Sequence, residues 1–448
     1  MHTPLVTSLS PFAYGACTQF PGKRWVRTRI VVAGAGYVGL TGALCLAQLG
    51  HTVACYDPDR ERISTLQAGT IPLREPGLQR LLDAAPGRVT FATRLPDGPV
   101  DADAVLLCVG TPARPDGSCD LSFLEQAVAD LAPRLPPGQL VITRSTVPPG
   151  TNRRLQGAFG ERARVVACPE FLREGSAVAD FLRPDRMVFG AAGPEDAEPA
   201  AAIFAGLPGK RLVTTWEAAE IIKYASNAFL AVRVSFANEL AGLCAHFGAD
   251  PAAVMYGIGL DPRIGTGYLS PGAGYGGSCL PKDVGALLHT AGTAGCQLRV
   301  VQAAAQVNDE QPRRLVQRLA EAAGGLAGQP VALWGLAFKA GTDDLRASPA
   351  LRLLAALREA DATVRAHDPA AMEAAARLEQ APLLAASPLE AARGAYALVI
   401  ATEWPEYEGA DLQATRAVMS GPWLLDCRNV IDPGAARRAG FHYLGVGR

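Results

Sequence analysis

Short apolar runs that alternate with helical periodicity organise the first half of the chain. Residues 29–33 indicate a buried strand, residues 37–49 an apolar helix that Gly50 ends, and residues 52–57 a second strand. A helix is indicated at 123–135, and further strands at 88–94, 104–109, 140–145, 164–167, 187–190 and 211–214. Strands that alternate with helices predict a largely parallel sheet.

The hydrophobic pattern changes at Trp216. From Trp216 to about Phe247, apolar residues recur near helical spacing, which predicts one long helix. Its apolar positions include Ile221, Ala225, Phe229, Val232 and Phe236. A second helix is predicted over 297–323, and Gly324, Gly325 and Gly328 then mark a boundary. The middle of the chain is therefore predicted to be a helical domain.

A second α/β unit begins at Val331. An apolar strand, a helix at 349–360 and a strand at 363–367 follow one another, and Asp368-Pro369 echoes Asp57-Pro58 of the first unit. The run 397–402 likewise echoes 104–111. The predicted fold class is α/β, with two doubly wound Rossmann-like domains joined by a helical central domain with a long helix. The predicted bounds are 29–215, 216–324 and 325–448, after an N-terminal extension over 1–28.

Composition narrows the possible partners. The 448 residues suit two or three domains, and a net charge of −1 without a basic run gives no reason to expect nucleic acid. No apolar stretch is expected to span a bilayer, so no membrane partner is predicted. Ten scattered cysteines without Cys-x-x-Cys, and no His cluster, favour a reducing cytoplasm and no bound metal. Residues 1–28 make a poor secretory signal; a disordered tail is predicted, with an upstream start codon as the alternative.

A glycine motif follows the first strand. Gly34-Ala-Gly36-Tyr37-Val38-Gly39 has the form G-x-G-x-x-G and opens the first helix, and Asp57 ends the next strand 18 residues after Gly39. In this context Gly34 permits a tight turn, Gly36 lets the backbone approach a pyrophosphate, and Gly39 lets helix and strand pack closely. Asp57 would bind the adenosine ribose hydroxyls and repel a 2′-phosphate, which favours NAD over NADP. The alternative is a tight packing turn alone.

A cysteine lies in a second glycine-rich loop, Gly274 to Asp283. Pro281 follows Cys279 by two residues, and an apolar run begins at Val284, so the loop is predicted to enter a helix N-terminus. Amide groups there, and Lys282 nearby, favour a thiolate. Cys279 is therefore a candidate nucleophile, and the alternative is a small core thiol.

Other polar residues follow predicted strands, at the sheet edge where ligands bind in open α/β sheets. Gly110-Thr111-Pro112 and Ser145-Thr146-Val147-Pro148 occupy such places in the first unit. The second unit lacks G-x-G-x-x-G and carries Lys339 and Arg346 near its first turn instead. These two cations are suited to phosphate on a different ligand, with solvated surface charge as the alternative.

The order and spacing of eight motifs resemble the UDP-glucose/GDP-mannose dehydrogenase family over nearly all of the chain from Arg29 onward. The motifs are Gly34–Gly39, Glu75-Pro-Gly-Leu78, Val109–Pro112, Ser145–Pro148, Pro169–Gly175, Lys223–Phe229, Gly276–Asp283 and Gly335–Arg346. The resemblance implies four-electron oxidation of a nucleotide-sugar primary alcohol to a carboxylate, with NAD and without metal. It favours UDP-glucose because Asp261-Pro-Arg263-Ile-Gly265 resembles that branch. GDP-mannose and a UDP-N-acetylhexosamine stay open.

The resemblance also implies roles for particular residues. Cys279 would be the nucleophile, Lys223 and Asn227 would stabilise oxyanions, and Thr146, Glu170 and Asp283 would handle protons and water. The NAD site would include Gly34, Gly36, Tyr37, Val38, Gly39, Asp57, Arg62, Thr111, Thr146, Glu174, Lys282 and Arg346. The nucleotide-sugar site would include Phe171, Leu172, Arg173, Glu174, Lys223, Asn227, Arg263, Tyr268, Leu269, Ser270, Pro271, Gly272, Gly276 and Lys339.

Two other classes would share parts of this pattern. A two-electron hydroxyacid dehydrogenase would keep the NAD loop and a catalytic lysine but would not need Cys279. A non-catalytic NAD-binding sensor would keep only the glycine loop. Assembly is expected to be at least dimeric, because the long helix is too apolar to stand free and, by the resemblance, Arg263 would reach a neighbouring subunit.

Overall fold

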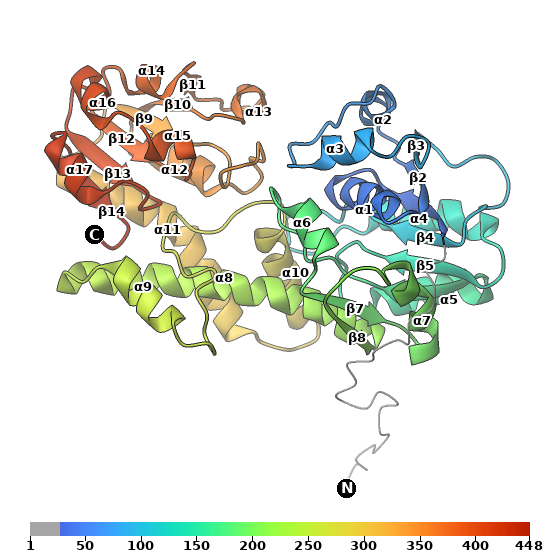
Figure 1. Cartoon of the computed structure of the whole chain (residues 1–448). Helices are drawn as coiled ribbons and strands as arrows, with labels where there is room; N and C mark the ends of the chain where they lie inside the picture. The colour runs from blue at the N-terminus through green and yellow to red at the C-terminus, as the bar shows by residue number, and fades with distance from the viewer. Residues whose placement is uncertain (1–26) are drawn as a thin grey trace, which may run out of the picture. The chain divides into compact units, whose positions relative to one another are not determined.

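A computed structural model describes residues 27–448, so the prediction for residues 1–28 falls almost wholly outside the described residues. The chain divides into two compact units between Ala225 and Ser226 (Figure 1). This division falls inside one long helix, and the predicted three-domain bounds stay a prediction.

The first unit is built on an eight-stranded sheet with the order β3-β2-β1-β4-β5-β6-β7-β8. Ile30 of β1 lies between Val53 of β2 and Ala104 of β4 in parallel register. β7 is antiparallel to β6, and all other neighbours in this sheet run parallel. The strands are β1 Arg29–Ala33, β2 Thr52–Tyr56, β3 Val89–Ala92, β4 Ala104–Leu107, β5 Gln139–Thr143, β6 Ala163–Ala167, β7 Arg186–Gly190 and β8 Lys210–Thr214.

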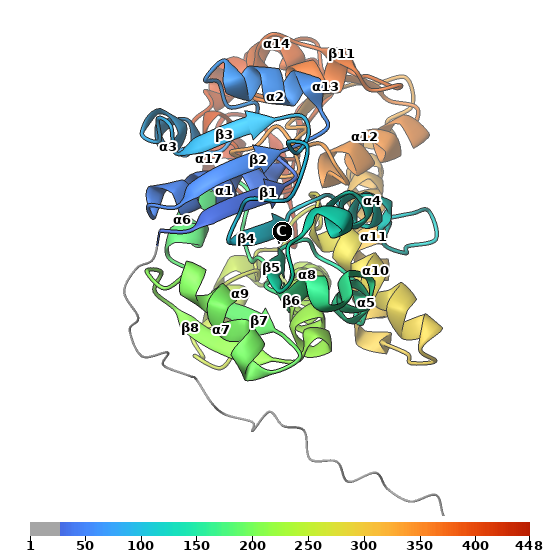
Figure 2. The ribbon, with the colours of Figure 1, turned by 90° about the vertical axis from the view of Figure 1, so that its right-hand side faces the viewer.

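Helices cover both faces of this sheet. α1, α3, α6 and α7 pack their apolar sides on one face, and α4 and α5 lie on the other (Figure 2). The helices are α1 Tyr37–Gln48, α2 Arg60–Gln67, α3 Leu78–Asp83, α4 Ser122–Leu131, α5 Thr151–Phe159, α6 Ala177–Leu182 and α7 Pro194–Ile203, with 3-10 turns η1 Ala132–Arg134 and η2 Gly160–Arg162. The sheet centre is buried on both sides, which explains the continuous apolar strand runs.

The second unit contains a six-stranded sheet with the order β11-β10-β9-β12-β13-β14. Every neighbouring pair of strands in it is parallel. The sequence similarity between the two units therefore reflects a shared topology. Its strands are β9 Pro330–Trp334, β10 Thr363–His367, β11 Leu383–Leu384, β12 Ala397–Ile400, β13 Trp423–Asp426 and β14 His442–Gly445. The predicted fold class, with two doubly wound sheets, is confirmed.

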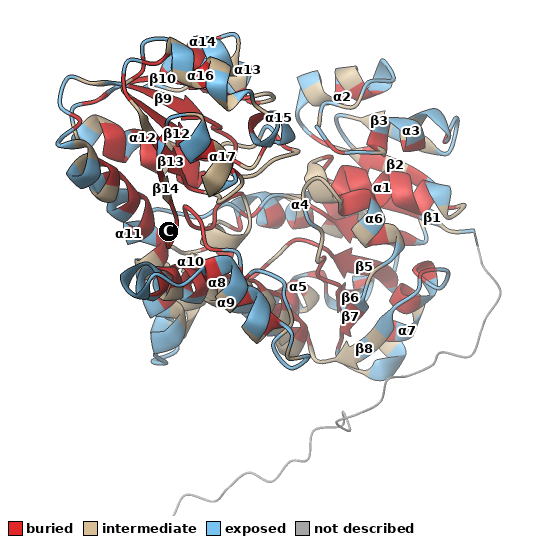
Figure 3. Ribbon diagram, turned by 60° about the vertical axis from the view of Figure 1, so that its left-hand side comes forward, coloured by how far each residue is buried: buried red, intermediate tan, exposed pale blue. Residues whose placement is uncertain are grey.

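Some helices of the second unit precede the strands of this sheet in the chain, and others alternate with them. Their bounds are α9 Pro251–Gly259, α10 Leu280–Thr293, α11 Arg299–Ala323, α12 Pro349–Glu359, α13 Met372–Ala376, α14 Pro388–Ala392, α15 Pro405–Glu408, α16 Leu412–Val418 and α17 Pro433–Arg438. The central strands of both sheets are buried, whereas much of α9 is exposed (Figure 3).

The long helix α8 spans Trp216–Phe247, as the periodicity predicts. It also corrects the expectation that no stretch could span a bilayer. α8 has 32 residues, and its most apolar window reaches a mean hydropathy of 1.3, because isolated charged residues interrupt the apolar run without lowering its average much. That window is 39% buried inside the chain, and core helices pass the same test of length and composition. One such helix is weak support for a membrane partner.

Candidate active site

The glycine loop between β1 and α1 has the geometry that a bound dinucleotide needs. Gly34 has a φ of +102°, and a Cβ there would lie 2.7 Å from the carbonyl oxygen of Cys108. A Cβ on Gly39 would lie 1.8 Å from the carbonyl oxygen of Gly34, so helix and loop touch at this point. At Gly36, by contrast, no heavy atom lies within 4 Å of an added Cβ. The loop is therefore packed beneath and open at Gly36, where a pyrophosphate would approach the amides of α1.

Asp57 follows β2 and faces this loop. Its Oδ2 accepts a hydrogen bond of 2.7 Å from the N–H of Ala35, and its Oδ1 pairs with Arg62 at 3.1 Å. The N–H of Asp59 also donates to Oδ1. A carboxylate offers about four acceptor positions, so Asp57 can hold the loop and still accept from a ribose hydroxyl. The preference for NAD over NADP stays a prediction.

The matching aspartate of the second unit is differently engaged. Asp368 follows β10 and is 1% exposed. Its oxygens accept from the N–H groups of Leu336, Ala337, Ala370 and Ala371 and from the indole of Trp404. With its acceptor positions filled from within the chain, Asp368 is a structural residue. The second unit thus repeats the topology of a dinucleotide domain, but its aspartate has no acceptor position left for a ribose hydroxyl.

A buried ion pair stands at the carboxyl ends of the strands in the first unit. Lys223 on α8 places Nζ 3.1 Å from Oε1 of Glu170, and both side chains are nearly inaccessible. Burial alone would raise the pKa of Glu170. The charge of Lys223, the N–H of Leu172 and the charge of Arg144 outweigh burial and hold that pKa below its usual value. Glu170 is therefore ionised beside a fixed ammonium group.

Thr111 and Thr146 lie beside this pair on the loops after β4 and β5. The hydroxyl of Thr111 donates to the carbonyl oxygen of Thr146 at 2.8 Å, which ties the two loops together. Thr146, Lys223 and Glu220 share the wall of a small cavity in the same unit. The structure thus brings together four predicted residues of the first unit: Thr111, Thr146, Glu170 and Lys223.

Glu220, one turn before Lys223 on α8, is a residue that the sequence analysis missed. Its carboxylate accepts from the N–H of Gly150 at 2.6 Å, and from the N–H and the side-chain amide of Asn152 at 2.7 and 2.8 Å. Burial raises the pKa of Glu220 to about 7, and these donors limit the rise. The contacts fix the start of α5 to α8. A charged residue on an apolar helix face was the available signal.

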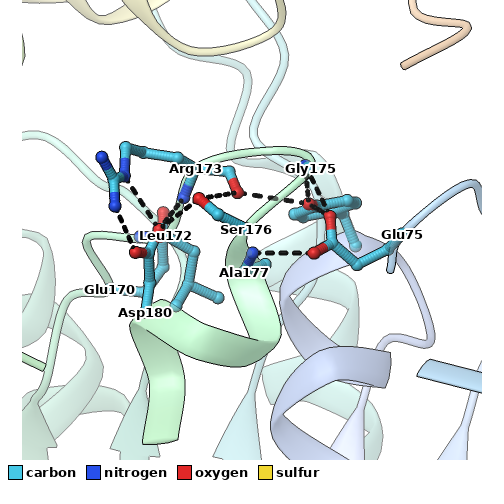
Figure 4. A network of polar contacts seen from close by, with 9 residues as sticks. Glu75, Glu170, Leu172, Arg173, Gly175, Ser176, Ala177 and Asp180 are labelled. Carbon is cyan, nitrogen blue, oxygen red and sulfur yellow. Dashed lines mark hydrogen bonds and ion pairs between the residues drawn. The ribbon is translucent and has the colours of Figure 1, made fainter. Parts of the chain in front are cut away.

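The predicted substrate residues Phe171 to Glu174 form a loop held by carboxylates (Figure 4). Glu170 accepts from the N–H of Leu172 at 2.6 Å, and Asp180 on α6 holds both the N–H and the guanidinium of Arg173. Phe171 packs under the guanidinium of Arg186 at 3.9 Å. The loop is therefore a pre-formed element whose exposed side chains include that of Arg173.

In the second unit, Cys279 is the N-cap residue of α10, and Pro281 lies in the first turn, as predicted. The thiol is half-buried, with Sγ 3.5 Å from the hydroxyl of Ser278. A Cβ on Gly276 would lie 2.4 Å from the carbonyl oxygen of Ala347, and the N–H of Gly277 donates to the carbonyl oxygen of Arg346. The cysteine loop is thus packed directly on the loop after β9, and larger residues would displace it.

A second polar cluster lies at the start of α10. Asp283 is buried, and its Oδ2 accepts from the side-chain amide of Asn227 at 2.6 Å while its Oδ1 pairs with Lys282 at 2.5 Å. Asp283 is one turn after Cys279 on the same helix, so the carboxylate and the thiol have a fixed relation. The structure brings together Cys279, Lys282, Asp283 and Asn227 in the second unit. Asn227 lies four positions after Lys223 on α8.

Three buried amides that support the cysteine loop were not anticipated. Asn238 of α8 accepts from the N–H of Gly272, and Gln311 of α11 donates to the carbonyl oxygen of the same glycine. Asn308 of α11 accepts from the N–H of Tyr275 at 2.7 Å and donates to its carbonyl oxygen. Polar residues on the buried side of predicted helices were the only signal, and sequence gives no indication of which loop they contact.

The other predicted residues of the second unit are spread over its surface and core. Leu269, Pro271, Gly272 and Gly276 are buried in the packing around the loop. Tyr268, with a φ of +59°, and Ser270 are exposed. Arg263 and Arg346 are exposed and form bidentate pairs with Asp261 and Asp344. Lys339 lies 5.6 Å from the ring of Phe338. Among these residues, Gly276 and Arg346 lie close together, where the cysteine loop packs on the loop after β9.

The β1–α1 loop with Asp57 has the geometry of a dinucleotide-binding site, as in the dinucleotide-dependent oxidoreductases. Sequence models of the UDP-glucose/GDP-mannose dehydrogenase family match three parts of the chain: the NAD-binding domain at residues 28–207, the central domain at 217–310 and the UDP-binding domain at 332–433. The chain belongs to this family. It is an NAD-dependent dehydrogenase of a nucleotide sugar.

Characterised relatives cover nearly the whole chain. A UDP-glucose 6-dehydrogenase of Pseudomonas aeruginosa is 44% identical over 94% of this chain and 97% of its own length. A UDP-glucose 6-dehydrogenase of Rhizobium meliloti is 42% identical over 94% of this chain and 99% of its own length. Among solved structures, a UDP-glucose dehydrogenase from Pyrobaculum islandicum matches with a TM-score of 0.88 and 38% identity, covering 96% of this chain and 99% of its own.

Proposed function

We propose that the protein oxidises UDP-glucose to UDP-glucuronate, with two NAD reduced and one water consumed per sugar. The observation that carries this proposal is the placement of Cys279 at the N-cap of α10, in a tightly packed glycine loop, one turn before the buried Asp283. A two-electron dehydrogenase has no use for such a thiol. The identity to relatives named UDP-glucose 6-dehydrogenase supports this substrate over GDP-mannose or a UDP-N-acetylhexosamine.

NAD, when bound, accepts the hydride in each of the two oxidations. In the first, the primary alcohol loses a hydride and a proton and becomes an aldehyde. Lys223 supplies a fixed positive charge where the alkoxide develops, and its position is set by Glu170. Asn227 is proposed to add a hydrogen-bond donor from the same helix.

The second oxidation needs a tetrahedral carbon that still carries hydrogen. The thiolate of Cys279 adds to the aldehyde and gives a thiohemiacetal, whose loss of hydride leaves a thioester. Helix N-terminal amides and Lys282 favour the thiolate form. The chain's part in this step is to hold the sulfur atom in place, and the contacts of Gly276 and Gly277 with the loop after β9 serve that end.

Glu170 is proposed as the base that activates water to hydrolyse the thioester, which releases the carboxylate and the free thiol. In the resting protein its pKa is held low, partly by Lys223. When an oxyanion on the substrate pairs with the ammonium group of Lys223, the interaction of Lys223 with Glu170 weakens. The pKa of Glu170 then rises, and Glu170 becomes a better base. Thr146 and Asp283 are proposed to orient water and transfer protons.

The remaining expectations concern the setting of the enzyme. We propose assembly as at least a homodimer, with Arg263 of one subunit near the sugar site of another, and a cytoplasmic location. The exposed Arg263 is compatible with such a contact. The nine described cysteines form no disulfide among themselves, which suits a reducing compartment.

The decisive experiment is a count of NADH formed per nucleotide sugar consumed, run on a panel of UDP-glucose, GDP-mannose and UDP-N-acetylhexosamines. The expected result is a yield of two with UDP-glucose and the highest kcat/KM among the panel. A yield of one would indicate an ordinary two-electron dehydrogenase. A yield of two only with another sugar would move the proposal to that substrate, and no turnover with any would refute it.

A further inference from the structure

The loop that carries the predicted substrate residues, residues 170–177 (loop 170–177), has its backbone held by carboxylates. Each of four N–H groups in it donates to a carboxylate (Figure 4). The pairs are Leu172 with Glu170, Arg173 with Asp180, Gly175 with Glu75, and Ala177 with Glu75. Glu75 alone holds two of these amides, at 2.6 and 2.8 Å, and it comes from a segment a hundred residues away.

Glu75 belongs to the Glu75-Pro-Gly-Leu78 motif, for which neither the resemblance nor the chemistry above supplies a role. Its side chain is buried, at 7% exposure, and it forms no ion pair within residues 27–448. Its carboxyl oxygens accept hydrogen bonds from the two loop amides and from the hydroxyl of Tyr37. A buried carboxylate without a cation depends on every such donor, since each unmade bond leaves charge unsolvated.

Tyr37 connects this cluster to the dinucleotide loop. It is the first residue of α1, directly after the open Gly36. Its hydroxyl donates to Oε2 of Glu75 and accepts from the N–H of Gly175 at 3.1 Å. Burial, followed by the bond to Glu75, raises the pKa of Tyr37, so the hydroxyl is a neutral donor. One rigid side chain therefore spans from the expected pyrophosphate position to loop 170–177.

We propose that Tyr37 and Glu75 are positioning residues that couple dinucleotide binding at the Gly34–Gly39 loop to nucleotide-sugar binding on loop 170–177. This rests on the proposed function for the identity of the second ligand. A dinucleotide that fixes the start of α1 also fixes the Tyr37 hydroxyl, and through it Glu75 and the amide of Gly175. The two ligands would then strengthen each other's binding, by the same factor in either direction.

Asp180 offers a matched control. It holds the same loop through hydrogen bonds with Arg173 and Ser176, and not with Tyr37 or Glu75. A variant Asp180→Asn loosens the loop without cutting its connection to the dinucleotide loop. If Glu75 only stabilises the loop, Glu75→Gln and Asp180→Asn should behave alike. If Glu75 couples the sites, they should differ.

The first test measures UDP-glucose affinity by calorimetry with and without saturating NADH, a pair that cannot turn over. The wild type should bind UDP-glucose about fivefold or more tightly with NADH present. In Tyr37→Phe and Glu75→Gln this ratio should fall to within about twofold of one. In Asp180→Asn it should stay at the wild-type value even where the affinity itself is lower. A wild-type ratio of one, or an unchanged ratio in both variants, overturns the inference.

A second test removes the dependence on the sugar. Hydrogen exchange of the peptide that covers residues 172–179 is followed with NADH alone. NADH should slow exchange at Gly175 and Ala177 in the wild type and in Asp180→Asn, but not in Tyr37→Phe. Equal protection in Tyr37→Phe overturns the coupling. If UDP-glucose fails to bind the wild type while this protection is present, the proposed substrate is wrong and the coupling stands.

Discussion

At the scale of the residue, the proposed chemistry depends on Cys279. The change Cys279→Ser keeps the size of the side chain and removes the readily formed thiolate, so the thiohemiacetal route closes. We expect kcat to fall by about 10³-fold or more, while NADH affinity stays within about twofold because the β1–α1 loop is in the other unit. Steady-state kinetics with UDP-glucose and NADH fluorescence titration measure the two effects.

Ser278→Ala is the control for this prediction. Its hydroxyl lies 3.5 Å from the same sulfur atom, so it tests whether any disturbance of the loop abolishes turnover. We expect a much smaller loss than for Cys279→Ser. Acid quench of the wild type during turnover should also leave a thioester on the Cys279 peptide. Near wild-type turnover of Cys279→Ser, still with two NADH, would refute the covalent mechanism.

Residues of the site could be predicted only where they sit in a recognisable local context. Gly34, Gly39 and Asp57 belong to a strand–loop–helix–strand pattern, and the structure gives the two glycines the tight turn and the close packing expected of them. It places Asp57 against the same loop, and its ribose contact stays a prediction. The structural roles of Asn308 and Glu220 could not be predicted. Each side chain bonds to a loop that is distant in the chain, and the sequence does not indicate which loop that is. The bond between Tyr37 and Glu75 joins two motifs that sequence order alone leaves unrelated.

At the scale of the element, the start of α8 should make stability depend on pH. The pKa of Glu220 rises from 4.5 to about 7 on folding, so its neutral form favours the fold. Its contribution is complete below about pH 4.5 and is lost as pH rises towards 7, by up to roughly 3 kcal/mol. Glu220→Gln stays neutral at every pH. The unfolding temperature of this variant, relative to that of the wild type, should therefore rise as the pH increases from 5 to 8.

Glu217, one turn earlier on α8, is the matched control. Its bond to Arg153 lowers its pKa below the usual value, so its contribution changes only below about pH 4.5. The difference between Glu217→Gln and the wild type should therefore be flat between pH 5 and 8. Thermal unfolding at several pH values measures both variants. Equal pH profiles for the two would show that Glu220 does not titrate in this range.

The elements themselves were largely readable from the hydrophobic pattern. α8 runs from Trp216 to Phe247 as its periodicity indicates, because a 3.6-residue repeat over many turns has few alternatives. The antiparallel β7 was not foreseen, since an apolar strand run carries no sign of its direction. The bilayer-length apolarity of α8 was missed for a related reason: scattered charges hide a high average.

At the scale of the whole molecule, the fold followed from repetition. The motif Asp-Pro after the second strand recurs at Asp57 and Asp368, and both sheets share the strand order that begins 3-2-1-4. Topology is predictable in such a case because right-handed β-α-β crossovers leave few arrangements. Function diverges between the copies through single contacts, such as the extra amides and the indole that occupy the oxygens of Asp368.

The exposed side chains of α8 predict how the whole molecule assembles. Apolar side chains on the second part of α8 are exposed: Phe229 at 62%, Phe236 at 48%, Leu243 at 54% and Phe247 at 73%. They recur at intervals of seven, seven and four residues, so they lie along one stripe of the helix, and an apolar stripe of this length indicates a protein contact. A two-fold pair of α8 helices would cover each stripe with its copy. We therefore expect the wild type to be at least a dimer by light scattering at micromolar concentration.

Phe236→Glu tests this stripe, because it places a charge near the middle of the apolar contact. We expect it to shift the mass towards the monomer and to lower activity, since Arg263 is proposed to act across the interface. Phe123→Glu is the control: Phe123 is 57% exposed on α4 of the first unit and is not one of the stripe residues, so its substitution should leave the mass unchanged. A fully active wild-type monomer, or a Phe236→Glu protein that keeps the wild-type mass, would contradict an assembly through α8.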